Sequence, residues 1–156
     1  MEVKADKLNK DAKKPKESER DLFVTCFTDG SLCHQSGAWG IAFWVKYGMS
    51  DKPVMKWEGG KGEPRELNST VVERMALEKA KSYILKNYNI EGKVLVIQSD
   101  SLPAINGFST KEFKKAGAKH VKMKHVKAHT SNNTNRTTVN DMVDRKARKA
   151  MREYRD

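Results

Sequence analysis

The chain has 156 residues and a mass of 17.7 kDa, which fits one compact domain. Its hydrophobic fraction of 37% is enough for a core, but no run of about 18 apolar residues could form a membrane-spanning helix. Lysine and arginine number 31 against 20 aspartates and glutamates, so the net charge is +11. This excess favours a polyanionic partner and carries no information about the fold.

The first twenty residues are polar and contain no apolar stretch typical of a signal peptide. We therefore expect a cytoplasmic protein or, for a viral one, a protein of the host compartment that holds its nucleic acid. Residues 1–20 read as a disordered, mixed-charge, lysine-rich tail, and residues 21–156 as one folded domain. Cys26 and Cys33 are too few for a disulfide framework.

The positive charge is concentrated in the last third of the chain. Residues 1–20 carry +2 and residues 21–110 carry none, whereas residues 111–127 carry +6 and residues 145–156 carry +4. Runs of this kind are often only solvated helix faces. The basic surface nevertheless belongs to the folded domain more than to the tail.

Taken in chain order, the folded part begins with three strands. Leu22–Thr28 is β-branched and aromatic and ends at the turn signal Asp29-Gly30-Ser31. Gly37–Tyr47 reads as a longer strand and Val54–Trp57 as a short one, followed by a loop at Gly59–Pro64. Short connections of this kind predict an antiparallel meander.

Helices then alternate with strands. Apolar residues at three- and four-residue steps predict a helix over Thr70–Asn87, and the apolar run Lys93–Gln98 is typical of a strand buried on both faces. The remaining expected elements are two short helices, a strand and a terminal helix, at Leu102–Phe108, Thr110–Lys115, His120–Val126 and Thr138–Tyr154. The order β-β-β-α-β-α-β-α predicts an α/β domain with helices packed on a mixed sheet.

Four acids occupy notable places, and each also has a purely structural explanation. Asp29 and Asp100 follow predicted strands, where turn and cap residues are common. Glu73 has capping-box spacing to Thr70, and Asp144 lies four residues before Arg148 in a helix. Clustered without a cation, such acids would repel one another, whereas divalent ions would bridge them for phosphoryl displacement.

Five segments in order resemble ribonuclease H of type 1, over about Leu22 to Ala150. The segments are Phe27–Ser31 with Gly37–Gly40, Glu73–Ala76, Gln98–Ser101, Val126–Thr130 and Asn140–Ala147. The resemblance implies an RNase H-like fold, with a mixed five-stranded sheet and helices on both faces. It implies an endoribonuclease that cuts the RNA strand of RNA/DNA hybrids and leaves 3′-hydroxyl and 5′-phosphate ends.

The same resemblance implies the roles of individual residues. Asp29, Glu73, Asp100 and Asp144 would hold two Mg²⁺ ions, with Mn²⁺ as a substitute, and His129 would assist proton handling or product release. Substrate contacts are expected on three groups of residues: the loop residues Ser31, Cys33 and Gln35; the residues before and after the carboxylates, Asn68, Ser69, Thr70 and Ser101; and the lysines Lys122, Lys124 and Lys127. We expect a monomer whose partner is the hybrid and not a membrane.

The sequence departs from the family pattern at several places, and two of them bear directly on contacts with the substrate. Leu102 stands where many members carry a glutamine that contacts RNA. The segment between Asp100 and His129 is too short for the basic helical protrusion of some members, so its lysines would contact the backbone instead.

Three other interpretations stay open at this point. The chain could be a catalytically inactive nucleic-acid-binding module on the same fold, or a junction resolvase or exonuclease of the wider superfamily. It could also be an ordinary basic domain, in which case the four acids would lie out of bridging reach of one another. Nor does the sequence distinguish primer removal in DNA replication from R-loop removal or a role beside a reverse transcriptase.

Overall fold

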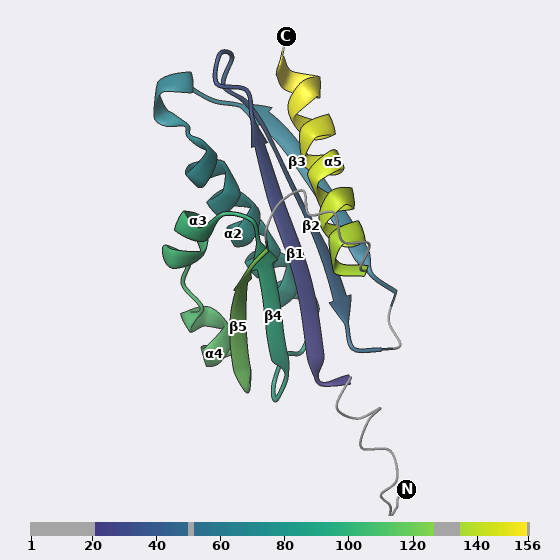
Figure 1. Cartoon of the computed structure of the whole chain (residues 1–156). Helices are drawn as coiled ribbons and strands as arrows, with labels where there is room; N and C mark the ends of the chain where they lie inside the picture. The colour runs from purple at the N-terminus through teal and green to yellow at the C-terminus, as the bar shows by residue number, and fades with distance from the viewer. Residues whose placement is uncertain (1–20, 50–51, 127–134, 156) are drawn as a thin grey trace, which may run out of the picture.

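The computed structural model of the chain describes residues 21–49, 52–126 and 135–155 (Figure 1). The predicted tail over residues 1–20 lies outside them. The elements in order are β1 (Phe23–Leu32), β2 (Ala38–Tyr47), β3 (Val54–Lys61), the 3₁₀ helix η2 (Pro64–Glu66), α2 (Ser69–Asn87), β4 (Val94–Ser99), α3 (Leu102–Asn106), α4 (Lys111–Lys115), β5 (His120–His125) and α5 (Asn135–Arg155).

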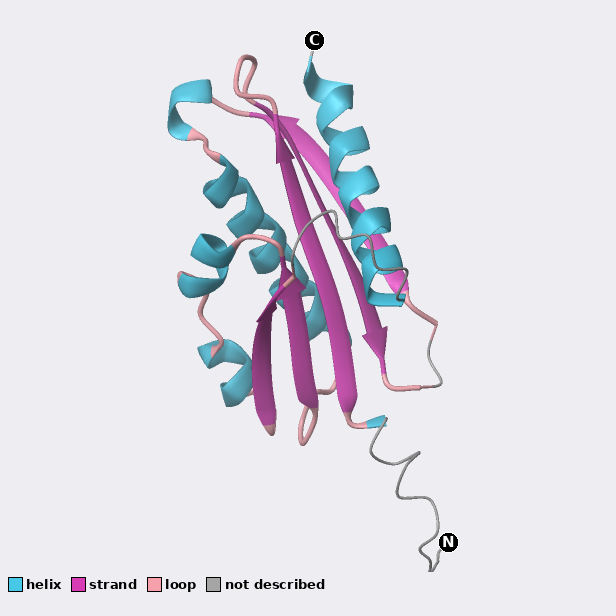
Figure 2. Cartoon of the chain, viewed as in Figure 1, coloured by secondary structure: helices cyan, strands magenta, loops and turns pink. Residues whose placement is uncertain are grey.

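One sheet runs through the domain with the strand order β3-β2-β1-β4-β5. β1 pairs with β2, and β2 with β3, in antiparallel fashion, whereas β4 is parallel to both β1 and β5. α5 lies on one face of this sheet, while α2, α3 and α4 lie on the other (Figure 2). The predicted mixed five-stranded sheet with helices on both faces is therefore confirmed.

Alternating side chains of the strands build the two cores. Val24 and Cys26 of β1 are fully buried in a large cluster that includes Leu77 and Ile84 of α2. Phe27, which has the opposite orientation in the strand, packs with Val143 and Ala147 of α5. The sheet is thus held from both sides by apolar contact, and its strand ends are fixed relative to both long helices.

Two glycines allow α5 to lie directly on the sheet. A Cβ atom at Gly40 of β2 would collide with the backbone of Ala147 and Met151 in α5, and a Cβ atom at Gly59 of β3 would lie 2.6 Å from the Ala150 carbonyl oxygen. Glycine is needed here for close approach of two backbones. The height of α5 above the sheet, and with it the position of Asp144, depends on these residues.

The predicted turn at Asp29-Gly30-Ser31 is wrong. These residues continue β1 and pair with Ala42, Ile41 and Gly40 of β2, and the chain turns further on, where the Cys33 amide donates to the Ala38 carbonyl at 2.8 Å. Pairing with β2 overrides the local turn signal. Gly30 is required for packing, since a Cβ there would lie 2.9 Å from the Val72 side chain of α2.

Other boundaries also shift. Gly59–Lys61 was expected in a loop but belongs to β3, because Gly59 and Gly60 pair with Gly40 and Trp39 of β2. α3 ends at Asn106, earlier than expected, and α5 begins at Asn135, earlier than the expected Thr138. Within the described residues, no helix combines the length and apolar character needed to cross a membrane.

Candidate metal centre

Three of the four predicted metal-binding acids meet at one place on the sheet edge. Asp29 lies in β1, Asp100 directly follows β4, and Glu73 lies in the first turns of α2. The parallel register pairs Phe27 with Gln98, so the two strands carry Asp29 and Asp100 to the same height. Carboxylate oxygens of Asp29, Glu73 and Asp100 all lie within 4.8 Å of one another.

Two of the three acids are buried, Asp100 is half-buried, and their negative charges repel one another. Asp29 is 2% exposed and Glu73 is 8% exposed. Burial raises the pKa of Asp29 to about 8, and the charge of Asp100 adds to the effect. Burial is also the main reason why the pKa of Glu73 is raised, and the charges of Asp29 and Asp100 raise it further. Burial is likewise the main reason why the pKa of Asp100 is raised. The three acids hold protons more tightly than free carboxyls do.

The cluster has the chemistry of a divalent-cation site. Its donors are all carboxylate oxygens, which Mg²⁺ and Mn²⁺ prefer. The Oε1 atom of Glu73 is buried and has no hydrogen-bond partner in the described part of the chain. A cation would supply the missing partner and relieve the repulsion among the three charges, so the residues present fit such an ion.

Asp144 lies beside this cluster without belonging to its tight core. It is carried by α5, and its charge contributes to the raised pKa values of Asp29 and Asp100, for which burial is the main cause. Its Oδ2 atom accepts from the Arg148 guanidinium at 2.9 Å, the i,i+4 pair that the sequence offered as an alternative role. Proximity to the cluster and pairing with Arg148 therefore coexist.

Two of the predicted site residues, His129 and Lys127, lie outside the described residues. Lys122 and Lys124 lie on β5, next to Val96 and Gln98 of β4. Ser31 pairs with Gly40 in the sheet, and Cys33 and Gln35 belong to the β1–β2 connection. A hydrogen bond with the Ser36 side chain is the main reason why the pKa of Cys33 is lowered.

The remaining predicted contacts lie at helix starts. Asn68 is the N-cap of α2, and its Oδ1 atom accepts from the Val71 amide at 2.9 Å. Ser69 and Thr70 form the first turn of that helix. The hydroxyl of Ser101 accepts from the Ala104 amide and caps α3. Asn68 and Ser101 thus have structural roles next to Glu73 and Asp100.

One neighbour of the cluster was left without a role at the sequence level. His125 ends β5 opposite Ser99, and its Nε2 atom lies 3.2 Å from the backbone oxygen of Asp100. Because β4 and β5 are parallel, the strand register would have placed His125 at the same edge as Asp100. The spacing of the motifs alone did not carry that signal.

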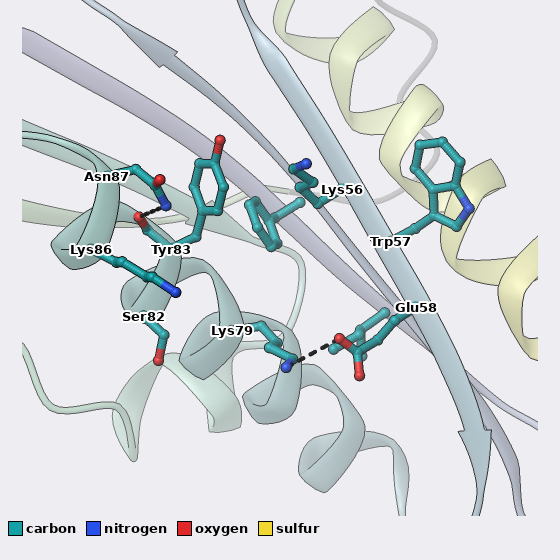
Figure 3. Close-up of a pocket in the computed structure, with 10 residues that line it drawn as sticks. Lys56, Trp57, Glu58, Lys79, Ser82, Tyr83, Lys86 and Asn87 are labelled. Atoms are coloured by element: carbon teal, nitrogen blue, oxygen red, sulfur yellow. Dashed lines mark hydrogen bonds and ion pairs between the residues drawn. The ribbon is translucent and has the colours of Figure 1, made fainter.

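A groove of about 500 Å³ between α2 and β3 is separate from the acid cluster (Figure 3). Lys79 and Glu58 form an ion pair of 3.2 Å across it, and Lys56 lies 5.8 Å from the centre of the Tyr83 ring. None of the predicted catalytic residues lines this groove. The side chains on its β3 wall alternate with those facing α5, so it opens on the opposite face of the sheet.

No known family model matches the sequence, and no curated protein does. Among solved structures, the chain is similar to the N-terminal RNase H domain of rv2228c from Mycobacterium tuberculosis, solved as a fusion with maltose binding protein. The TM-score is 0.58 at 14% sequence identity, and the match covers 85% of this chain and 95% of that chain. The chain therefore has an RNase H-like fold.

Proposed function

We propose that this protein is a divalent-metal-dependent endoribonuclease of the type 1 ribonuclease H family that cuts the RNA strand of RNA/DNA hybrids. One observation carries the proposal: three carboxylates from β1, α2 and the end of β4 converge within 4.8 Å on an RNase H-like sheet. The buried, unpartnered Oε1 atom of Glu73 supports a cation there.

Each residue has a defined task in this proposal. Asp29, Glu73 and Asp100 hold the metal, and Asp144 on α5 completes the binding of a second ion. Bound Mg²⁺ ions, two per site, would activate the attacking water and stabilise the leaving 3′ oxygen. His129 assists proton handling near that water or the release of the product. The chain itself needs no strong nucleophile, and the products carry 3′-hydroxyl and 5′-phosphate ends.

The test is cleavage of an end-blocked RNA/DNA hybrid with Mg²⁺, followed by sequencing of the product ends. Asp29→Asn should lower the cleavage rate by more than about 100-fold, because even groups that only support a metal ligand contribute 10- to 100-fold. Glu91→Gln is the matched control, since this exposed acid lies in the connection between α2 and β4. Calorimetric titration with Mg²⁺ should show weaker binding for Asp29→Asn and unchanged binding for Glu91→Gln.

The binding-module, exonuclease and resolvase alternatives predict different results when the substrate is varied. Binding of the hybrid without any cleavage by the wild-type chain would contradict the enzyme and favour a binding module. Cleavage that needs a free end would indicate an exonuclease, and cleavage of DNA-only junctions a resolvase. Internal cuts confined to the RNA strand would support the proposal.

A further inference from the structure

A second groove lies on the α5 face of the sheet, next to the acid cluster along β1 and β4. It has a volume of about 520 Å³ and is lined by residues of β1, β2, β4 and β5, with Val139 of α5 at one side. Pockets of 300–1,000 Å³ accommodate small organic ligands, so there is room for a nucleotide. None of the proposed metal ligands lines this groove, and it shares no lining residue with the groove between α2 and β3.

The groove has an apolar and aromatic floor that also contains two uncharged polar side chains, Thr25 and Gln98. Phe27 and Trp44 lie edge to face with their ring centres 5.7 Å apart, and Val96 lies beside them in the lining. Gln98 also lines the groove and is only 2% exposed, yet its Oε1 atom has no hydrogen-bond partner among the described residues. A ligand that combines a flat apolar face with polar edge groups would satisfy both features.

The charged side chains of the lining are all positive. They are Lys46 of β2 and Lys122 and Lys124 of β5, and no acid lines the groove. Lys46 is partly held by a hydrogen bond to the Met49 carbonyl at 3.1 Å, whereas Lys122 is exposed. This charge is complementary to phosphate groups passing along the rim.

The groove continues the acid cluster along the same strands. Phe27 and Gln98 precede Asp29 and Asp100 by two residues each. Residues two apart in a strand face the same side and are separated by about 7 Å. A polymer whose phosphate lies at the acids therefore reaches the groove with its neighbouring unit.

We propose that this groove binds an unpaired nucleotide strand, RNA or DNA, that continues from the hybrid at the acid cluster. The inference rests on the proposed function for the position of the hybrid. A base stacks on the Trp44–Phe27 floor and presents donors and acceptors to the Gln98 amide, while the phosphates contact the lysines. An acidic peptide would match the lysines, but it would not account for the groove's alignment with the acids.

The experiment compares blunt hybrids with hybrids that carry a six-nucleotide single-stranded extension. Fluorescence anisotropy is measured with the full chain in Ca²⁺, with extensions placed on either end of either strand. At least one extension should tighten binding roughly tenfold, the effect of one stacked base. Lys122→Glu and Trp44→Leu should each reduce this extended-to-blunt affinity ratio to near one. Lys86→Glu, which makes the same charge change in the opposite groove, should leave the ratio unchanged.

The outcomes separate this inference from the proposed function. An extended-to-blunt ratio near one for every wild-type combination would overturn the groove assignment, even if the hybrid were cut. Equal loss for Lys86→Glu and Lys122→Glu would also overturn it, as would tight binding of an acidic peptide in place of the strand. Because Lys122 is exposed, its variant tests the groove even if Trp44→Leu fails to fold. Failure of the proposed function would appear instead as absence of hybrid cleavage.

Discussion

At the scale of single residues, the buried acids make the metal-free protein sensitive to pH. The folded state raises the pKa of Asp29 from its ordinary value of 3.8 to about 8, mainly through burial. Between about pH 4 and pH 8 the folded chain therefore binds more protons than the unfolded chain, so its stability falls as the pH rises. In the presence of a chelator, the melting temperature should be lower at pH 8 than at pH 5.

A bound cation should reverse this trend, since metal binding needs deprotonated carboxylates. Adding Mg²⁺ should raise the melting temperature more at pH 8 than at pH 5. Glu73→Gln removes one of the repelling charges, so this variant should be less sensitive to pH without metal and should gain less from Mg²⁺. A Glu73→Gln chain with the wild-type pH profile and the wild-type Mg²⁺ response would show that these acids form no metal site.

The sequence could predict that Asp29 and Asp100 lie close together, but not how the side chains around them are held. Asp29 and Asp100 follow from strand register, because two parallel neighbours bring their ends to one edge. The pairing of Asp144 with Arg148 and the contact of His125 with Asp100 depend on side-chain geometry that spacing does not determine. The N-cap of α2 is Asn68, whereas the capping-box spacing of Glu73 had pointed to Thr70.

At the scale of elements, the start of α2 positions Glu73. Asn68→Ala removes the side chain that caps the helix and should lower the free energy of unfolding by about 1 kcal/mol. Because Glu73 follows directly on the first turn of α2, hybrid cleavage should fall as well. Urea denaturation and cleavage rates measure the two effects.

Two matched variants test this account of the α2 start. Asn68→Asp keeps an oxygen acceptor at the cap and should retain most of the stability. Thr70→Ala should have the smaller effect, since the α2 cap bond is made by Asn68. A larger loss of stability for Thr70→Ala than for Asn68→Ala would contradict the assignment of the cap.

The second feature at this scale is the contact of α5 with the sheet, which determines where Asp144 lies. Gly40→Ala places a methyl group against the α5 backbone, which cannot move aside as a flexible side chain can. Overpacking of this kind costs about 1–3 kcal/mol of stability. Cleavage should fall too, since α5 carries Asp144. In Gly62→Ala the new methyl would meet only the end of the Leu67 side chain, so unfolding in urea should change less.

The ends of the strands could not be predicted correctly from the sequence. Asp29-Gly30-Ser31 and Gly59-Gly60-Lys61 both have the composition of turns, yet both lie in strands. In each segment one glycine is needed because a helix approaches the sheet closely, with α2 against Gly30 and α5 against Gly59. Tertiary packing, which a local pattern does not record, selects glycine for a different reason than a turn does.

At the scale of the whole molecule, the charge is divided between an acidic centre and a basic edge. The lysines of α4 and β5 lie at the end of the sheet opposite β3, and Lys114 and Lys115 are exposed there. Residues 21–110, which include three of the four acids, have no net charge, whereas residues 111–127 carry +6. In the proposed function, this separation would let cations bind at the acids while the hybrid backbone is held beside them.

Binding of a hybrid should therefore weaken steeply with salt. If four lysines of this edge contact phosphates, the affinity should fall roughly a hundredfold between 50 and 200 mM salt, because each contact releases a counterion. Lys114→Gln and Lys115→Gln should each lower the slope of log affinity against log salt by about one, measured with an uncut hybrid in Ca²⁺. Lys52→Gln, an exposed lysine next to β3, should leave the slope unchanged. Equal changes for all three variants would mean that net charge alone, and not the β5 edge, attracts the hybrid.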